Sequence, residues 1–321
     1  MNLVILIMNN KNYTKLLKKI DKDLLNIYNK GPKSLIETYK YTFSATGKRI
    51  RPLLTILTSK SINGDYKKSY NAALAIEILH NFTLVHDDIM DNDSMRHGKK
   101  TLHERWDTST AILAGDAMLA ISLNLLTNSK YNNKILKAFN KGLLTVCEGQ
   151  ALDKEFEKKE TVSEKEYLDM IEKKTSHLIA MPIEIGALVY GVNKEDIKKL
   201  FKFGICIGKA FQIQDDFLEI TSNSKEMKKS LNSDILLDKK TYPILLCKQK
   251  NNKFITKLMN NKNPKEIIRQ LREFIIENNI DKKINKKIDK LYDIGLNSIK
   301  TIKFKNSELL EFVKLIKERK K

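Results

Sequence analysis

Two short runs of acidic residues are the clearest chemical feature of the sequence. In the first, Asp87, Asp88 and Asp91 follow a mostly apolar stretch that begins at Ala72. Carboxylates four positions apart lie on one face of a helix, so Asp87 and Asp91 repel each other. A divalent cation removes that repulsion, and Mg²⁺ usually takes one or two carboxylates together with substrate phosphates. The run therefore indicates a magnesium site, and the alternative is a solvated acidic helix end.

A second acidic run repeats the pattern much later in the chain. Asp215, Asp216 and Glu219 end another long apolar stretch. Two acidic helix ends predict a shared cleft in which facing carboxylates hold several metal ions around one polyphosphate. The repetition makes two unrelated solvated helix ends a poor explanation.

Compact basic motifs accompany the acidic runs. The guanidinium fork of Arg and the ammonium of Lys are both ordinary phosphate ligands. In a chain this rich in Lys, only a position beside a turn or an acidic helix end distinguishes one basic residue from the rest. Those so placed are Lys48, Arg49 and Arg51 in GKRIRP, Arg96 and Lys99 in RHGK, Lys174 before Thr175, and Lys229 and Lys239.

The composition favours helices and a reducing environment. Among 321 residues only 5 are Pro and 12 are Gly. The net charge of +20 is spread along the chain without an RNP-like, zinc-finger or helix-turn-helix signature, so we expect no nucleic acid partner. Three widely spaced cysteines without a CxxC pair indicate the cytoplasm. The apolar opening from Leu3 to Met8 is far shorter than the about 20 residues that span a bilayer, so we expect no transmembrane segment.

Apolar residues recur at helical spacing along most of the chain, and no strict alternation typical of strands competes with it. No Pro/Gly/Ser-rich linker separates two domains. We therefore predict an all-α fold and a single domain over residues 1–321, with residues 1–10 and about 303–321 peripheral. Long helices are expected over residues 70–91, 110–126, 132–156, 163–190 and 194–220.

Eight sequence blocks occur in an order that resembles the trans-isoprenyl diphosphate synthases, also called polyprenyl synthetases. The tract from Glu77 to Asp91 and the block AILAGD resemble archaeal-type geranylgeranyl diphosphate synthases most. One acidic DDxxD motif is unspecific, whereas eight ordered blocks are very specific. From about Gly47 to Pro243 they are GKRIRP, EILHNFTLVHDDIMDND, RHGKKT, AILAGDAML, EGQALD, KTS, FQIQDDFLE and DKKTYP.

The resemblance implies an antiparallel helical bundle around a deep central cavity, of the isoprenoid synthase type, and a homodimer. It also implies a Mg²⁺-dependent prenyltransferase that joins isopentenyl diphosphate to dimethylallyl, geranyl or farnesyl diphosphate, with C20 geranylgeranyl diphosphate as the product. The allylic C–O bond ionises, the isopentenyl double bond attacks the cation, and a proton is lost to the departing diphosphate. No side-chain nucleophile is required, and three Mg²⁺ are expected in each liganded active site.

The family's functional residues carry over by position. Asp87 and Asp91 should bind Mg²⁺, and Asp215 a further Mg²⁺ from the opposite wall; with Lys174 they form the expected catalytic set. On an ideal helix His80 projects within about 20° of Asp87. The expected substrate ligands are Lys48, Arg51, His80 and His97 for isopentenyl diphosphate, and Arg96, Lys174, Thr175, Gln212, Lys229 and Lys239 for the allylic diphosphate.

Two positions bear on specificity. Phe82 and Thr83 stand fifth and fourth before Asp87, where bulk limits product length in the family, and an aromatic followed by a small residue resembles the C20 pattern. An ideal helical wheel places Thr83 nearer the Asp87 face, so Phe82 is either the stopper implied by the resemblance or ordinary core. His97 replaces a usual Arg. Because a neutral imidazole has no fixed charge, we expect weaker or pH-dependent binding of isopentenyl diphosphate.

Two other functions fit part of the pattern. A class I terpene cyclase shares the helices and the ionisation chemistry, but it has no second diphosphate for GKRIRP and RHG to bind. A non-catalytic subunit of a hetero-oligomeric synthase is consistent with His97, although the intact Asp87, Asp91, Asp215 and Lys174 argue against it. Only the synthase should elongate farnesyl diphosphate with isopentenyl diphosphate and Mg²⁺.

Overall fold

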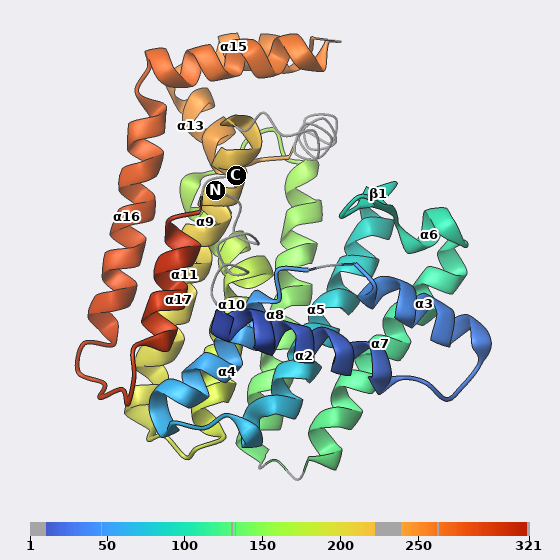
Figure 1. The fold of residues 1–321 in the computed structure, drawn as a ribbon. Helices are drawn as coiled ribbons and strands as arrows, with labels where there is room; N and C mark the ends of the chain where they lie inside the picture. Colours follow the sequence, from blue (N-terminus) through green and yellow to red (C-terminus); the bar gives the residue numbers. More distant parts are fainter. Residues whose placement is uncertain are drawn as a thin grey trace. The chain divides into compact units, whose positions relative to one another are not determined.

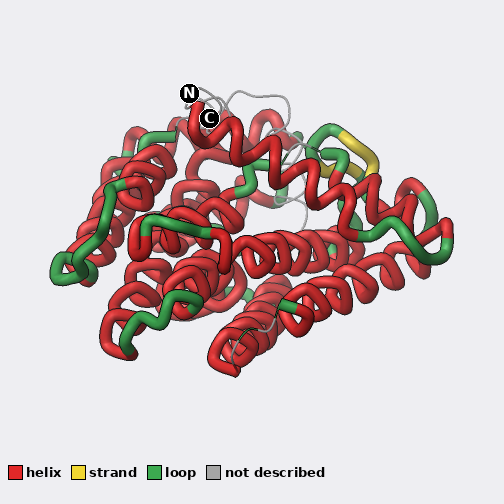
Figure 2. Tube along the Cα trace, turned by 60° about the horizontal axis from the view of Figure 1, so that its bottom comes forward, coloured by secondary structure: helices red, strands yellow, loops and turns green. Residues whose placement is uncertain are grey.

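The computed structural model describes residues 11–45, 47–129, 131, 133–221, 239–261 and 263–319, and these are almost entirely helical (Figure 1). Figure 2 shows the helices joined by loops, with one small two-stranded hairpin. The predicted all-α fold is confirmed. The predicted ligand Lys229 and residues 1–10 lie outside the described residues.

The long helices begin and end within a few residues of the predicted positions. The difference lies in the predicted helix 163–190, which is three consecutive pieces. A short π-helix, η2 (Glu172–Ser176), separates α9 (Glu164–Ile171) from α10 (His177–Leu188). The hairpin was also not predicted, because strands of two residues have no sequence periodicity. The remaining long helices are α5 (Tyr70–Met90), α7 (Thr108–Asn128), α8 (Asn133–Glu157) and α11 (Lys194–Thr221).

The chain forms two compact units. Unit 1 comprises Met1–Leu143, Met181–Lys198 and Ile302–Arg319, and unit 2 comprises Leu144–Ala180, Lys199–Thr301 and Lys320–Lys321. The single domain expected from the sequence stays a prediction. Residues 303–319, expected to be peripheral, supply four buried apolar side chains to unit 1: Leu309, Phe312, Val313 and Ile316.

Unit 1 is built around α5, whose residues 72–79 are all buried. Helices α4 and α7 pack against it. α7 approaches closely at Gly115, where a Cβ atom would lie 2.3 Å from Nε2 of His86. The other elements wholly in unit 1 are α2 (Lys11–Ile27), α3 (Lys33–Phe43), α4 (Ile50–Asn63), η1 (Lys67–Ser69), β1 (Met95–Arg96), β2 (Lys99–Lys100), α6 (Leu102–Arg105) and α17 (Glu308–Lys317).

Among the described residues, α7 is the one helix long and apolar enough to cross a membrane by length and composition. Only 33% of its apolar window is buried. Ile112 and Leu113 are 43% and 60% exposed. One such helix is weak support for a membrane span, because core helices of other proteins meet the same criterion.

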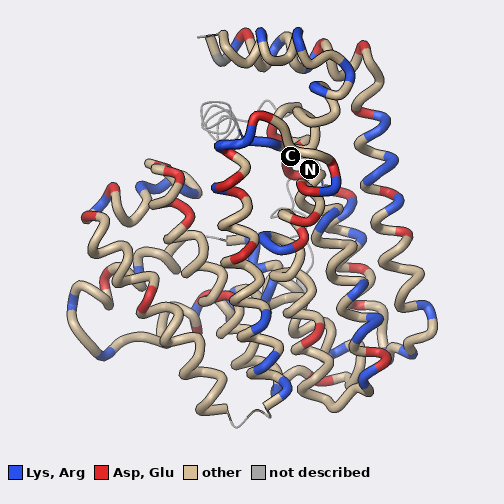
Figure 3. The backbone as a smooth tube through the Cα atoms, turned by 180° about the vertical axis from the view of Figure 1, so that it is seen from behind, with Lys and Arg blue, Asp and Glu red and all other residues tan. Residues whose placement is uncertain are grey.

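Unit 2 has a core of large aromatic side chains, and its C-terminal helices carry exposed ion pairs. Tyr167, Phe203, Tyr242 and Tyr292 are each at most 1% exposed. Basic residues are spread over many helices, with several along α16 (Figure 3). The elements wholly in unit 2 are α9, η2, α13 (Tyr242–Lys250), α14 (Asn252–Met259), α15 (Pro264–Glu277) and α16 (Ile280–Ser298).

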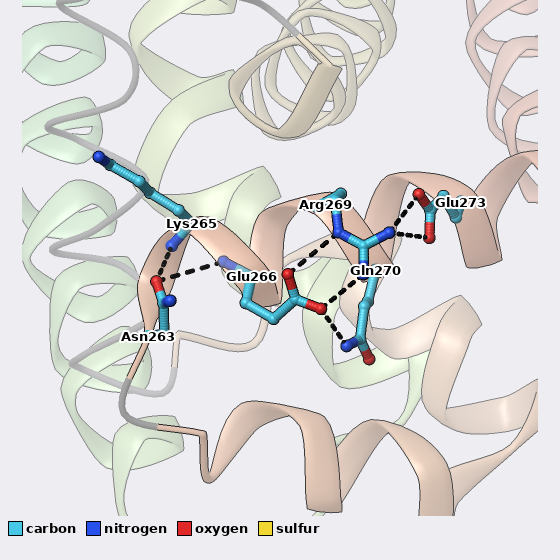
Figure 4. Close-up of polar contacts among 6 residues, drawn as sticks. All are labelled: Asn263, Lys265, Glu266, Arg269, Gln270 and Glu273. Carbon is cyan, nitrogen blue, oxygen red and sulfur yellow. Dashed lines mark hydrogen bonds and ion pairs between the residues drawn. The ribbon is translucent and has the colours of Figure 1, made fainter.

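Helix α15 shows how these surface charges are arranged (Figure 4). Oδ1 of Asn263 accepts hydrogen bonds from the backbone N–H groups of Lys265 and Glu266, at 3.2 and 3.4 Å, and so caps the helix. Arg269 pairs with Glu266 at 2.6 Å and with Glu273 at 2.7 Å. Water screens such exposed pairs, so they add little stability.

Candidate active site

The first acidic run ends helix α5 in unit 1. Asn92, which follows Asp91, has a left-handed backbone with φ of 52°. The N–H of Asp93 donates to the carbonyl of Asp88 at 2.9 Å, and that of Asn92 donates to the carbonyl of Ile89 at 3.3 Å. This Schellman arrangement closes the helix, and Asn is among the residues that adopt the left-handed conformation most readily. The sequence thus stops α5 immediately after its acidic run.

Carboxylates at this helix end lie in an unfavourable field, because a helix C-terminus carries about half a negative charge. Asp87 is half-buried and Asp91 is buried. Two carboxylates one turn apart suit Mg²⁺, which obtains its other oxygen ligands from phosphate and water. Within the described part of the chain, no three His, Cys, Asp or Glu side chains group closely enough to hold a metal alone.

Asp88, between these two, is directed toward Arg96. On an ideal helix it points about 100° away from Asp87 and about 60° away from Asp91. Its side chain is buried, and its Oδ1 accepts a hydrogen bond from Nε of Arg96 at 2.5 Å. Burial raises the pKa of the Asp88 carboxyl to about 7, and the charge of Arg96 opposes that shift. Arg96, a predicted ligand of the allylic diphosphate, is thereby held at the acidic helix end.

A tight hairpin returns Arg96 to Asp88. Strand β1 pairs with β2, with Arg96 opposite Lys99. The two residues of the turn, His97 and Gly98, have φ of 49° and 76°. Two consecutive positive φ angles define a type I′ turn, and His tolerates this region better than most side chains do. The histidine that departs from the family pattern therefore lies at the tip of the hairpin.

The motif GKRIRP is fixed by a buried arginine. Arg49 has φ of 47° directly before α4, and its side chain is 3% exposed. Its Nη1 donates to Oε1 of Glu77 and its Nε donates to Oδ1 of Asp21, both at 2.8 Å. These bonds join α2, α5 and the loop before α4. The predicted isopentenyl diphosphate ligands Lys48 and Arg51 flank this anchor in the sequence.

His80 is a neutral imidazole in cationic surroundings. Burial lowers its pKa well below 6.5, and the charges of Arg51, Arg96, Arg49 and His97 lower it further. Its Nδ1 is buried and makes no hydrogen bond to the described residues. A neutral ring can donate one hydrogen bond but carries no charge. Three of the predicted diphosphate ligands thus act electrostatically on His80, as expected beside an anion site.

The second acidic run, near the end of α11, belongs to unit 2. Asp215 is half-buried, whereas Asp216 is 5% exposed. Oδ2 of Asp216 accepts hydrogen bonds from the hydroxyl of Tyr167 at 2.7 Å and from the backbone N–H of Tyr242 at 3.1 Å. Its Oδ1 accepts one from Nε2 of Gln212 at 2.8 Å. Asp216 therefore joins α9, α11 and the start of α13.

Three predicted ligands of the allylic substrate lie in this unit with their side chains already held. The hydroxyl of Thr175 donates to Oε1 of Gln212 at 2.8 Å, which extends the hydrogen-bonded chain from Asp216. Nζ of Lys174 lies 2.5 Å from Oδ2 of Asp153, a residue of the block EGQALD. Lys174 is therefore fixed by an ion pair to α8.

The π-helix η2 carries both Lys174 and Thr175, and two glycines make room for its backbone. A Cβ atom at Gly149 would lie 2.2 Å from the backbone N of Lys174, and one at Gly208 would lie 2.4 Å from Cα of Ser176. Real Cβ atoms essentially never approach within 3.0 Å. Helices α8 and α11 therefore accept only glycine here without displacing η2. π-helical turns frequently occur at functional sites.

The predicted chain-length residues lie on α5. Phe82 is 8% exposed, and its ring packs edge-on against that of His86, with centroids 4.7 Å apart. The hydroxyl of Thr83 donates to the carbonyl of His80 at 2.8 Å. Their role in limiting the product stays a prediction.

The structure brings several of the predicted ligands together within each unit. In unit 1, Arg51, His80, Arg96 and His97 interact electrostatically. In unit 2, Thr175 and Gln212 are bonded to each other, and Lys239 precedes α13. The cleft shared by the two acidic runs stays a prediction. The supporting residues that sequence reasoning missed are Asp21, Glu77, Asp153, Tyr167 and Tyr242, and of these Glu77, Asp153 and Tyr242 fall within recognisable blocks.

An all-helical chain with two acidic helix ends and basic side chains held beside them is typical of enzymes that act on prenyl diphosphates. The polyprenyl synthetase family model matches residues 32–275, and the chain belongs to this family. The predicted family and prenyltransferase class are thereby confirmed.

Named relatives agree with this assignment. Over 297 residues the chain is 38% identical to the geranylgeranyl diphosphate synthase of Sulfolobus acidocaldarius, covering 88% of this chain and 89% of the relative. It is 42% identical over 218 residues to the geranylgeranyl pyrophosphate synthase of Geoglobus acetivorans, covering 67% and 68%. The crystal structure of geranylgeranyl pyrophosphate synthetase from Pyrococcus horikoshii matches with a TM-score of 0.86 at 30% identity, over 96% of this chain and 100% of that one.

Proposed function

We propose that this protein condenses isopentenyl diphosphate with an allylic diphosphate and releases C20 geranylgeranyl diphosphate. The observation that carries the proposal is the acidic end of α5, where Asp88 holds Arg96 at 2.5 Å beside the carboxylates of Asp87 and Asp91. Two relatives that are 38% and 42% identical carry the name of a synthase with this product. They do not favour a terpene cyclase or a non-catalytic subunit.

Asp87, Asp91 and Asp215 are the proposed ligands of Mg²⁺, with three ions in each liganded site. When bound, the metal stabilises the charge that develops on the departing diphosphate, an effect worth several kcal/mol in comparable sites. The carboxylate oxygens supply the hard donors that this cation prefers. Lys174 belongs to the same catalytic set.

The basic side chains bind the two substrates in this proposal. A neutral His80 donates one hydrogen bond to isopentenyl diphosphate, while fixed charges come from Lys48 and Arg51, with His97 beside them. The side chains of Arg96 and Lys174 are already fixed by ion pairs with carboxylates, so they lose little further conformational freedom when they bind the diphosphate. The proposed ligands of the allylic diphosphate are Arg96, Lys174, Thr175, Gln212, Lys229 and Lys239.

We propose that the active form is a cytoplasmic homodimer. Support comes from α7, an apolar helix on which Ile112 and Leu113 are exposed. A second copy of the chain would cover these apolar side chains. Light scattering coupled to size-exclusion chromatography measures the mass directly, and a monomer at assay concentration contradicts this part of the proposal.

Product analysis tests the central proposal. The purified protein is incubated with Mg²⁺, isopentenyl diphosphate and farnesyl diphosphate, and the dephosphorylated products are separated by chromatography. A linear C20 alcohol is expected. A cyclic hydrocarbon formed without consumption of isopentenyl diphosphate indicates a cyclase, and no turnover indicates a non-catalytic subunit.

A further inference from the structure

The β-hairpin that carries Arg96 is attached to two helices of unit 1. Through β1 it is attached to α5, because the guanidinium of Arg96 pairs with Asp88 at 2.5 Å. Through β2 it is attached to α3. Arg96 and Lys99 are partners across the hairpin, so the strand that contacts α3 also fixes the backbone beside Arg96. A hairpin alone is marginally stable at best, so its orientation depends on these attachments.

The attachment to α3 is made by Tyr41, near the end of that helix, and by Ser44, which follows it. The hydroxyl of Tyr41 donates to the backbone carbonyl of Lys100 at 2.9 Å. Nζ of Lys99 donates to Oγ of Ser44 at 2.8 Å and lies 5.3 Å from the centroid of the Tyr41 ring. Both residues of β2 are therefore bonded to the end of α3.

The ring of Tyr41 is itself held by the end of α6. The indole of Trp106 packs edge-on against it, with centroids 5.3 Å apart and an interplanar angle of 81°. The guanidinium of Arg105 lies 4.3 Å from the centroid of the Tyr41 ring and 5.0 Å from that of Trp106. A cation over an aromatic face is attracted by the quadrupole of the ring. These contacts fix the direction in which the hydroxyl of Tyr41 points.

We propose that Tyr41 and Lys99 are positioning residues that dock the hairpin on α3 and thereby place Arg96 for the diphosphate. The inference rests on the proposed function, in which Arg96 binds the allylic diphosphate. It also gives a role to Lys99, a basic residue beside a turn whose ammonium is bonded within the protein. Because Lys99 acts through the hairpin, its contribution to diphosphate binding depends on Arg96.

Three substitutions remove the docking contacts in steps. Tyr41→Phe removes only the hydroxyl, Tyr41→Leu also removes the aromatic ring, and Lys99→Met removes the ammonium but keeps a long side chain. Two matched controls change the same residue types elsewhere in unit 1. Tyr66→Leu alters a half-buried tyrosine that precedes α5, whose 21 residues, about 30 Å, separate it from the hairpin. Lys100→Met alters the exposed neighbour of Lys99 on the same strand.

The affinity for inorganic diphosphate tests the inference without requiring turnover. It is measured by isothermal titration calorimetry at saturating Mg²⁺, for each variant in the unmodified protein and again in an Arg96→Gln background. In the unmodified protein we expect Tyr41→Leu and Lys99→Met to weaken binding about fivefold, the scale of one net hydrogen bond, and Tyr41→Phe about twofold. In the Arg96→Gln background each of these losses should fall below about 1.5-fold, because the side chain that they position is absent.

The comparison of the two backgrounds separates positioning from a general effect on stability. An equal loss of affinity with and without Arg96 overturns the inference, and so does an unchanged affinity in Tyr41→Leu. A loss of the same size in Tyr66→Leu or Lys100→Met also overturns it. Should Tyr41→Leu not fold, Lys99→Met must show the same dependence on Arg96. If the unmodified protein binds diphosphate but transfers no prenyl group, the proposed function fails while the positioning result stands.

Discussion

Replacing Gly149 by alanine tests whether the π-helix η2 positions Lys174. The added Cβ would lie 2.2 Å from the backbone N and 2.5 Å from Cα of Lys174. To reach even the 3.0 Å lower limit of real contacts, α8 and η2 must separate by about 0.8 Å (3.0 − 2.2), because the obstructing atoms are backbone and cannot rotate away. Overpacking of this kind costs about 1–3 kcal/mol of stability.

The same displacement moves Lys174 relative to Asp153, to which it is bonded at 2.5 Å. A misplacement of about 1 Å at a catalytic group can reduce the rate about 100-fold. We therefore expect Gly149→Ala to fold, with a melting temperature lowered by several degrees, and to lose about two orders of magnitude in kcat/KM for farnesyl diphosphate. Differential scanning fluorimetry and the prenyl transfer assay measure the two effects.

The matched control is Gly191→Ala. Gly191 has φ of 71°, and no atom of the described residues lies within 4 Å of the point that a Cβ would occupy, so alanine there introduces backbone strain without a clash. This strain costs about 1–2 kcal/mol, and activity should be retained. Activity of Gly149→Ala equal to that of Gly191→Ala would refute the argument that glycine is required for the placement of η2.

Three further substitutions test separate parts of the site. Phe82→Ala should give products longer than C20 by chromatography of the dephosphorylated alcohols, and an unchanged C20 peak excludes Phe82 as the stopper. Asp87→Ala should lower turnover by orders of magnitude, as loss of metal binding requires; near-normal activity contradicts the assigned site. Arg49→Leu leaves Glu77 as a buried unpaired charge and should lower the free energy of unfolding by about 3–5 kcal/mol in denaturant titrations. The double variant with Glu77→Leu should recover most of that loss, and no recovery shows that the pair is not coupled.

The helices were predictable because a buried helix face requires apolar residues at a repeated spacing, and that spacing is visible in the sequence. The end of α5 was predictable for a local reason: Asn92 adopts the left-handed conformation that closes a helix. Both signals lie within a few residues of the element that they specify. They therefore locate Asp87 and Asp91 without knowledge of the rest of the fold.

The supporting contacts were not predictable because their partners are far apart in the chain. Arg49 pairs with Asp21 and Glu77, each 28 residues away. The π-helix follows from close approach of neighbouring backbones, and a lone glycine such as Gly149 is equally consistent with an ordinary helix position. Hydrophobic periodicity reports which face of a helix is buried but not which distant residues contact it, so these contacts can be found only in the three-dimensional structure.

The placement of the acidic runs bears on the proposed roles of their carboxylates. A carboxylate at a helix C-terminus is opposed by the helix dipole and by its acidic neighbours, so it persists there only with a compensating positive group. For Asp88 that group is Arg96, a permanent part of the protein. The charge of Arg96 also acts on Asp87, which shares a face with Asp91. In the proposed function, a cation that arrives with the diphosphate substrate compensates the remaining repulsion between Asp87 and Asp91.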